Sequence, residues 1–241
     1  MPEIDIIASV FNSDLFLEGY FNDLVSQTFF KECRLILVAP NPSSKLIKLS
    51  ASVNRIYQNV ELVSLSEDPG ISNCLNTAIK NSNSKYITIA NVDDRKREDS
   101  LFRHFIELES NSEIDLVYAP SLLSTKPNET FLMNSCKSIY PCYEFDGLQG
   151  LIRHNSPHNN PMWRRSLNEK NGYLDEKLRS AADGDLWMRC VANGSVFKMI
   201  PDILGLYYLN PNGMSTKPED SSSRSEEERA VKQKYIDILN G

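Results

Sequence analysis

Short apolar runs recur along roughly the first ninety residues and predict buried β-strands. Four runs carry this signal: Ile4 to Val10, Leu35 to Ala39, Val60 to Leu65 and Tyr86 to Ala90. Runs this short, bounded by polar or proline-containing stretches, are typical of strands. Because most of their residues are apolar, we expect a sheet that is covered on both faces.

Residues at helical spacing lie between these runs. Leu17 to Val25 follows the first run, where Ser13 or Asp14 is expected to cap the helix. Ile71 to Ile79 precedes the fourth run. Such alternation favours an α/β fold with a mostly parallel sheet and right-handed crossovers. Ligands of these sheets gather at the carboxyl ends of the strands, so the residues after the fourth run are candidates for a binding site.

The second half of the chain is less regular. Its predicted elements are a helix around Leu101 to Leu108, a strand over Asp115 to Ala119, a helix over Asp183 to Asn193, and strands over Val196 to Ile200 and Leu204 to Leu209. An irregular stretch runs from about Ser121 to Asn160. After that block, Ser221 to Ser223 is predicted to be a linker that precedes a surface helix of mixed charge. We expect one domain over residues 1–216 and a charged tail over 217–241.

Composition narrows the class of protein. Of 241 residues, 41% are hydrophobic and 24% are charged, as in ordinary globular domains. The formal net charge of -6 argues against a nucleic-acid partner. The five cysteines lack CxxC spacing and predict reduced thiols, which are typical of a cytoplasmic protein. No apolar stretch approaches the roughly 18 residues that a membrane span needs, and no targeting segment is evident.

Two carboxylates follow the fourth predicted strand directly, in Asn91-Val92-Asp93-Asp94. Oxygen ligands of this kind hold Mg²⁺ or Mn²⁺, and a cation held there can neutralise a diphosphate. An Asx turn, or a cap for the helix near Leu101, accounts for the same residues equally well from position alone.

The order of several motifs makes the chain resemble the glycosyltransferases of family 2, which have the GT-A fold and invert the transferred sugar. Ile7 to Asn12 and Leu35 to Ala39 resemble the first two strands of that family. Asp68 to Ile79 is similar to its Gly-Leu-Ser helix, and Tyr86 to Asp94 looks like the strand that leads into its Asp-x-Asp metal motif. The resemblance covers roughly residues 3 to 216 and implies that Asp93 holds the divalent metal, Mn²⁺ or Mg²⁺.

A later motif supplies the implied catalytic residue. Ala182 to Arg189 resembles the Glu-Asp-x-Asp-Leu-Trp-x-Arg segment of the family, in which the aspartate after the glutamate is the general base. Asp183 takes that role here, and a carboxylate is suited to accept the proton of an acceptor hydroxyl. The alternative is that Asp183 or Asp185 caps a helix whose Leu186 and Trp187 belong to the core.

The resemblance also implies a site for the nucleotide-sugar. We expect this site to contain Ser9, Asn12, Asn41, Gly70, Asn76, Asn91, Arg164 and Arg165. Guanidinium groups suit phosphate oxygens, but the two arginines are equally well explained as surface charges beside a buried Trp163. By the same resemblance, residues 1–119 form the half that binds the nucleotide-sugar. Residues 120–216 then form the half that binds the acceptor.

Three departures distinguish the chain from the family pattern. The first aspartate of the metal motif is Asn91, which is an uncharged oxygen ligand. The second strand ends in Ala39-Pro40-Asn41 in place of an aspartate that reads the nucleobase, with Asn41 as its candidate replacement. The glutamate before the base is Ala182, and the late histidine is Asn210. Metal affinity is therefore expected to be modest.

The sequence as a whole predicts an inverting, metal-dependent glycosyltransferase. Its donor would be a nucleotide-diphosphate sugar, expected to be a UDP-sugar, and its acceptor a saccharide or glycolipid of bacterial surface polysaccharide or glycolipid synthesis. We expect it in the cytoplasm, with peripheral association at the inner face of the membrane left open. The alternatives are a nucleotidyltransferase and a GT-A domain that has lost turnover and binds a nucleotide or a partner. A dinucleotide-dependent dehydrogenase is disfavoured because the chain has no GxGxxG pattern.

Overall fold

The fold was analysed in a computed structural model, which describes residues 2–136, 138–158, 160–213, 216–217 and 221–240. The first half contains β1 (Ile4–Ser9), α1 (Leu17–Ser26), η1 (Phe30–Glu32), β2 (Cys33–Pro40), α2 (Ser44–Tyr57), β3 (Val60–Leu65), α3 (Ile71–Lys80), β4 (Tyr86–Ile89), β5 (Arg95–Lys96), α4 (Ser100–Ser110) and β6 (Leu116–Tyr118). The second half contains β7 (Ser121–Ser124), α5 (Gly147–Arg153), β8 (Pro161–Arg164), α6 (Ser166–Asn171), α7 (Ala182–Ala192), β9 (Phe197–Met199), β10 (Gly205–Tyr208) and α8 (Ser221–Asn240).

The central sheet has seven strands in the order β3-β2-β1-β4-β8-β6-β9. Strands β1 to β4 are parallel to one another, and β6 is parallel to β9. Only β8 runs against its neighbours, so that Arg164 at its end pairs with Tyr86 at the start of β4. The carboxyl ends of β1 to β4 therefore share one edge of the sheet, whereas the end of β8 lies at the opposite edge.

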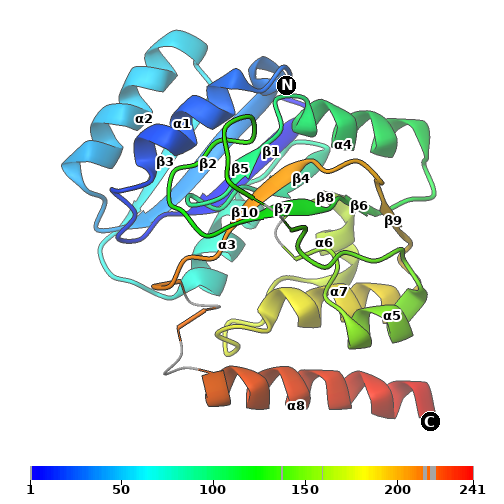
Figure 1. The fold of residues 1–241 in the computed structure, drawn as a ribbon. Coiled ribbons are helices and arrows are strands. Elements are labelled where there is room, and N and C mark those ends of the chain that lie inside the picture. Colours follow the sequence, from blue (N-terminus) through cyan, green and yellow to red (C-terminus); the bar gives the residue numbers. More distant parts are fainter. Residues whose placement is uncertain (1, 137, 159, 214–215, 218–220, 241) are drawn as a thin grey trace.

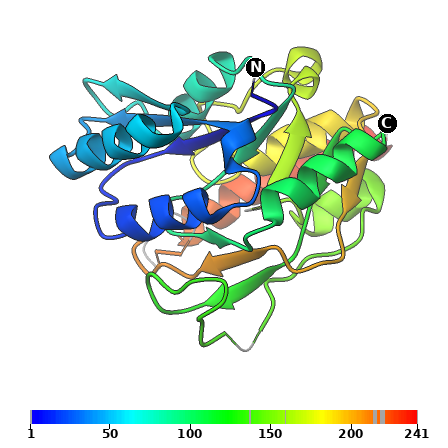
Figure 2. The ribbon, with the colours of Figure 1, turned by 90° about the horizontal axis from the view of Figure 1, so that it is seen from above.

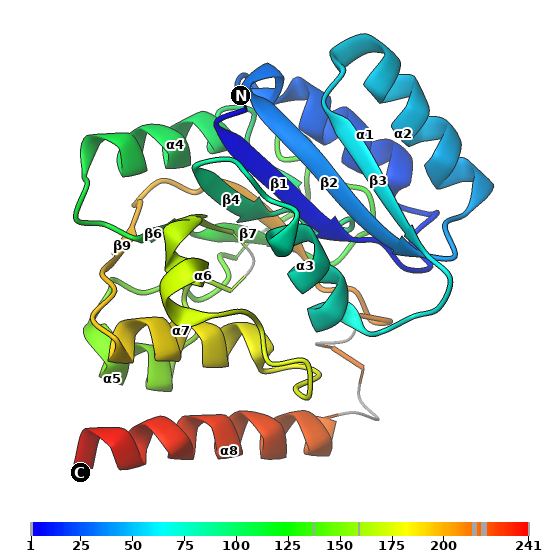
Figure 3. The same ribbon diagram turned by 180° about the vertical axis from the view of Figure 1, so that it is seen from behind.

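Helices cover both faces of this sheet, as the apolar strands predict (Figures 1 and 3). One core cluster packs the side chains of α1 and α4, with partly buried residues of α2, against one face. The other cluster packs α3, α5, α6, α7 and α8 against the second face. The predicted mostly parallel α/β fold is confirmed.

A second sheet has three strands in the order β5-β10-β7 and forms a separate layer beside α1 (Figure 2). β10 is antiparallel to β5 and parallel to β7. Since β5 begins at Arg95, directly after the candidate metal motif, this sheet brings the end of β10 next to that motif. The sequence analysis predicted β10 but neither of its partners.

Helix α8 lies outermost and packs along α7 (Figure 1). Val231 and Tyr235 are its buried residues. The predicted linker at Ser221 to Ser223 is wrong, because these residues form the first turn of α8. No helix among the described residues is both long enough and apolar enough to cross a membrane.

Two further expectations differ from the structure. Neither Ser13 nor Asp14 caps α1, which begins at Leu17 after an N-cap residue, Phe16, with no side-chain hydrogen bond. The Ser13 hydroxyl donates instead to the Phe11 carbonyl. Helix α2 was not predicted because only two of its residues are buried, so its apolar pattern is weak. Its cap is nevertheless regular: Ser43 accepts a hydrogen bond from the Leu46 amide.

Candidate active site

The loop after β4 is bonded to the end of β10. Oδ1 of Asp94 accepts a hydrogen bond of 3.0 Å from the Tyr208 amide, and Oδ2 accepts one of 3.0 Å from the Asn91 side chain. Asn210 donates from Nδ2 to Oδ2 of Asp93, also at 3.0 Å. The candidate metal motif and the position that replaces the late histidine are therefore in direct contact, although they are far apart in the sequence.

The charge of Asp93 contributes to a raised pKa at Asp94. Burial, followed by the charge of Asp93, raises the pKa of Asp94 to about 7, and hydrogen bonds from the Tyr208 amide and Asn91 partly offset the rise. Two carboxylates this close are unfavourable when both are ionised, so the loop attracts a proton or a cation. A site for a divalent metal has an excess of negative charge of this kind before the metal binds.

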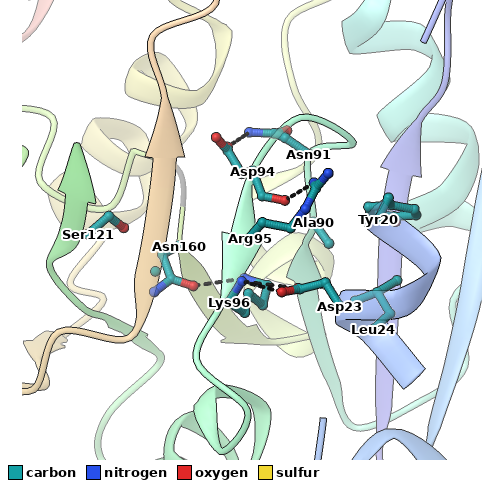
Figure 4. Close-up of a pocket in the computed structure, with 11 residues that line it drawn as sticks. Tyr20, Asp23, Leu24, Ala90, Asn91, Asp94, Arg95, Lys96, Ser121 and Asn160 are labelled. Carbon is teal, nitrogen blue, oxygen red and sulfur yellow. Dashed lines mark hydrogen bonds between the residues drawn. The ribbon is translucent and has the colours of Figure 1, made fainter. Parts of the chain in front are cut away.

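Arg95 fixes the backbone of the same loop. Its side chain is buried and donates from Nη1 to the carbonyl oxygens of Val92 and Asp94, at 2.9 and 2.6 Å (Figure 4). Its Nη2 donates to the Phe16 carbonyl at 3.4 Å and to Oδ1 of Asn128 at 3.1 Å. One guanidinium thus ties the loop to the start of α1 and to the segment after β7.

Behind Arg95 lies a small polar cavity of about 10 Å³, which is roughly the space that one water molecule needs (Figure 4). The Asp23 carboxylate accepts from the Lys96 amide at 3.0 Å, and Nζ of Lys96 donates to Oδ1 of Asn160 at 2.8 Å. Burial raises the pKa of Asp23 to about 7 and lowers that of Lys96 to about 8. The cavity is too small for a nucleotide, so these residues support the loop and do not bind the donor.

Asp183 lies in the first turn of α7, as expected, and its carboxylate is half-buried. Nδ2 of Asn155 donates to Oδ2 of Asp183 at 2.8 Å. Asn155 comes from the turn that follows α5, within the stretch that the sequence analysis described as irregular. This hydrogen bond orients the carboxylate, and α7 has Ala181 as its N-cap with no side-chain cap hydrogen bond. The role of Asp183 as a base stays a prediction.

Tyr207 of β10 was not singled out in the sequence. Its ring contacts that of His158, at 5.0 Å between centroids. The His158 amide donates to the carbonyl of Asn155, whose side chain binds Asp183. The amide of the next residue, Tyr208, donates to the loop after β4. β10 therefore contacts both that loop and the turn that holds Asp183.

Four of the expected nucleotide-sugar residues lie at the carboxyl edge. Ser9 ends β1, Asn12 and Asn41 follow β1 and β2, and Gly70 precedes α3. Asn12, Asn41 and Gly70 have positive φ angles of 48°, 46° and 88°, which are values typical of turns. With Asn91 after β4, five of the eight expected residues share this edge, and their binding role stays a prediction.

The structure does not bring Arg164 and Arg165 to the carboxyl edge, and their expected role toward the donor stays a prediction. Arg164 ends the antiparallel β8 and donates to the carbonyl oxygens of Ile114 at 2.8 Å, Leu108 at 2.6 Å and Asn111 at 3.0 Å. Arg165 donates to the Ser84 carbonyl at 3.1 Å. Both arginines lie at the amino-terminal edge of β4, across the sheet from Asp93, and Arg164 is committed to holding α4.

Asn76 is also a structural residue. Its side chain is buried, donates to the Leu174 carbonyl at 2.9 Å and to Oε1 of Glu176 at 3.0 Å, and accepts from the Leu174 amide at 3.0 Å. The amide group therefore joins α3 to the segment before α7. These bonds occupy both ends of the amide, and the expected contact of Asn76 with the donor stays a prediction.

The donor set around Asp93 fits a hard divalent cation. Within the described ranges, no group of three or more His, Cys, Asp or Glu side chains is arranged to hold a metal. The loop instead offers the carboxylates of Asp93 and Asp94 with the amide side chains of Asn91 and Asn210 next to them. Oxygen ligands of this kind are those that Mg²⁺ and Mn²⁺ prefer, usually with phosphate oxygens or water completing the shell.

Comparison with known sequences identifies relatives among glycosyltransferases. No family model matches the chain. An uncharacterised glycosyltransferase of Methanocaldococcus jannaschii is 26% identical over 219 residues, which cover 88% of this chain and 72% of the relative. The uncharacterised glycosyltransferase EpsJ of Bacillus subtilis is 24% identical over 244 residues, covering 90% of this chain and 64% of EpsJ.

Solved structures show the same fold. TarS of S. aureus in complex with UDP-GlcNAc superposes with a TM-score of 0.72 at 19% identity, over 96% of this chain and 65% of that chain. The mannosyltransferase PcManGT of Pyrobaculum calidifontis, in complex with GDP-Man and Mn²⁺, gives 0.65 at 13% identity, over 88% and 59%. The chain spans less than two thirds of these structures.

These comparisons confirm the resemblance to glycosyltransferases, and the chain shares its fold with TarS. They also support the predicted class of enzyme, a glycosyltransferase. The fold accounts for the position of the site, because β10 contacts both the loop after β4 and the turn that holds Asp183.

Proposed function

We propose that the chain transfers a sugar from a nucleotide-diphosphate donor to an acceptor hydroxyl, with inversion at the anomeric carbon. The observation that supports this proposal is that two consecutive residues of β10 contact two different parts of the chain. The Tyr208 amide binds Asp94, and the Tyr207 ring packs on His158, in the turn whose Asn155 binds Asp183. A carboxylate loop suited to a diphosphate and a carboxylate suited to a base are thus both linked to β10, and α/β sheets bind ligands at the edge where this loop lies.

On the donor side, Asp93 would hold the divalent metal, with Asn210 orienting the carboxylate. When bound, the metal supplies positive charge that neutralises the departing diphosphate. Arg95 keeps the loop in place, and the turns at Asn12, Asn41 and Gly70 line the edge on which the nucleotide would lie. The complexes of TarS with UDP-GlcNAc and of PcManGT with GDP-Man and Mn²⁺ support a nucleotide-sugar donor and a metal.

On the acceptor side, Asp183 is the proposed general base. The acceptor oxygen attacks the anomeric carbon while its proton passes to the Asp183 carboxylate. The bond between that carbon and the phosphate oxygen breaks, and the diphosphate leaves with the electron pair. The configuration inverts because attack and departure occur on opposite faces. Asn155 holds one carboxylate oxygen, which leaves the other oriented for the proton.

The finer assignments follow from the resemblance. We propose a UDP-sugar as the donor and a saccharide or glycolipid acceptor in the synthesis of a bacterial surface polysaccharide or glycolipid. This places the protein in the cytoplasm, with its acceptor at the inner face of the membrane. The half of the chain before residue 120 would bind the donor, and residues 120–216 would bind the acceptor.

The first experiment is a calorimetric screen of UDP, GDP, CDP and dTDP, each with Mn²⁺ and with EDTA. We expect one nucleotide, UDP, to bind more tightly with the metal. Sugars linked to that nucleotide are then tested for transfer and for hydrolysis in the wild type and in Asp183→Asn. Binding without any turnover in the wild type would favour a domain that has lost catalysis. No binding of any nucleotide would contradict the proposal.

A further inference from the structure

Helix α8 contacts the segment that carries Asp183 on both of its sides. The helix runs along α7 as the outer layer of the molecule (Figures 1 and 3). The family resemblance ends near residue 216, before α8 begins, so nothing in that resemblance gives the helix a role. Its contacts with α7 are polar as well as apolar, and they concentrate around the proposed base.

Before Asp183, the contact is made by the carboxylate of Glu227. Oε1 of Glu227 accepts hydrogen bonds of 2.7 Å from the backbone amides of Ser180 and Ala181, and one of 3.0 Å from the Ser180 hydroxyl. Oε2 accepts from the Arg179 amide at 3.0 Å. Burial opposes ionisation of Glu227, but these hydrogen bonds outweigh it and lower its pKa. The carboxylate therefore binds three successive amides immediately before α7.

After Asp183, the contact is made through Asp185, whose side chain is buried. Oδ1 of Asp185 accepts from Nζ of Lys234 and from the phenol of Tyr235, both at 2.9 Å. The Tyr235 phenol is also 3.1 Å from the Asp185 carbonyl. On α7 itself, Arg189 donates to the other carboxylate oxygen at 2.9 Å. The chain is thus bonded to α8 both two residues before Asp183, at Ala181, and two residues after it, at Asp185.

We propose that α8 is part of the catalytic apparatus and that Glu227 is a positioning residue, which sets the place of the Asp183 carboxylate at the sheet edge. This inference rests on the proposed function, because it assumes that Asp183 is the base. The amides that Glu227 binds lie just before α7, and an anion at the amino-terminal end of a helix is favourable. Position 182, where the family has a glutamate, is alanine here, and the acidic group beside this segment comes from α8 instead.

The test compares Glu227→Ala with Glu226→Ala in the full chain. Glu226 is the neighbouring exposed carboxylate on the same helix, so both variants remove one negative charge and one helix carboxylate. Hydrogen exchange of the amides of residues 179–183 is measured with kcat, the donor KM, and nucleotide binding by calorimetry. Glu227→Gln is the conservative variant, because an amide oxygen can still accept the hydrogen bonds that Oε1 receives.

We expect Glu227→Ala to accelerate exchange of these amides about tenfold or more, since hydrogen bonds to a charged group are lost. Its kcat should fall about 10-fold to 100-fold, because a small displacement of a catalytic group slows the reaction by about this factor. The donor KM and nucleotide binding should stay near the wild-type values. Glu227→Gln should recover most of both losses, and Glu226→Ala should match the wild type.

The proposal is overturned if Glu227→Ala exchanges and turns over like Glu226→Ala, or if its loss appears in donor KM with kcat unchanged. Retained nucleotide binding shows that the variant is folded. A wild type that transfers no sugar defeats the proposed function instead. In that case, faster hydrogen exchange of these amides in Glu227→Ala still supports the attachment of this segment to α8. Unchanged exchange overturns that attachment.

Discussion

The side chain of Asn210 donates a hydrogen bond of 3.0 Å to the carboxylate of Asp93, across a separation of 117 positions in the sequence. Oδ1 of Asn210 in turn accepts from the Asn212 amide at 3.0 Å, so the donor group of Asn210 is held toward Asp93. An uncharged side chain therefore orients the proposed metal ligand.

Replacement of Asn210 should weaken metal-dependent binding of the nucleotide. In Asn210→Ala, Asp93 loses a hydrogen bond worth about 1 kcal/mol, so we expect the dissociation constant of the nucleotide with Mn²⁺ to rise about fivefold. Calorimetry with Mn²⁺ and with EDTA measures this effect. Asn212→Ala, which keeps the backbone amide, is the control, and an equal loss in the two variants would argue against the role given to Asn210.

Removal of the proposed base should affect the chemical step alone. We expect Asp183→Asn to lower kcat by about 10²-fold to 10⁴-fold, the usual contribution of a general base, with nucleotide binding unchanged. The measurement is steady-state transfer with the donor identified in the screen. Asp237→Asn, an exposed carboxylate on α8, serves as the matched control. Loss of nucleotide binding in Asp183→Asn would assign this residue to the donor site.

Arg95 should be important for stability. Its buried guanidinium donates to four acceptors, and a lysine side chain in the same place reaches fewer of them. We expect Arg95→Lys to lower the free energy of unfolding by about 2 to 4 kcal/mol. Arg103→Lys alters an arginine that is partly exposed and paired with Asp202, and it should cost less than about 1 kcal/mol. Urea denaturation of the two variants gives the comparison, and similar midpoints would contradict the prediction.

Asp23 should make stability depend on pH. Its pKa in the folded chain is about 7, against an ordinary value of 3.8. Between these values the folded chain holds a proton that the unfolded chain has lost, so this stabilisation is complete below about pH 4 and is lost as the pH rises through 7. Asparagine at this position removes the titration and keeps an oxygen for the Lys96 amide.

The melting temperature of Asp23→Asn, relative to the wild type, should therefore rise steadily from pH 4 to pH 7.5. The charge of Asp23 raises the pKa of Lys96, so its removal lowers that pKa, and Lys96 then adds to the rise near the upper end of the range. Thermal unfolding at half-unit intervals of pH tests the expectation. A constant offset between the two proteins would show that the pKa of Asp23 is close to its ordinary value.

The sequence predicted the elements whose burial is regular. Strands β1 and β2 are almost wholly buried, and their apolar runs are continuous as a result. Helix α2 was not predicted because the residues of its exposed face dominate its composition. The candidate residues that follow parallel strands, Asn12, Asn41 and Asp93, were placed at the correct edge, because parallel strands connected by helices all end there.

Some placements could not be predicted because they depend on how distant strands pair. Arg164 has the right side chain for a phosphate, but β8 is antiparallel to β4, and the direction of a strand is not visible in its own residues. Tyr207 was missed for the converse reason. Its role depends on β10 being placed between β5 and β7, a pairing that local sequence does not reveal.

The hydrogen bonds from α8 to the start of α7 also have a consequence for synthesis on the ribosome. The Arg179 amide and its acceptor Glu227 are separated by 48 positions. Domains fold from the amino terminus as the chain emerges, so the parallel strands β1 to β4 can pair early. The loop after β4 needs Tyr208 and Asn210 for its hydrogen bonds, and the segment around Asp183 needs Glu227 and Tyr235 for its own. The segment that carries the proposed base would therefore be the last part of the site to be held in place.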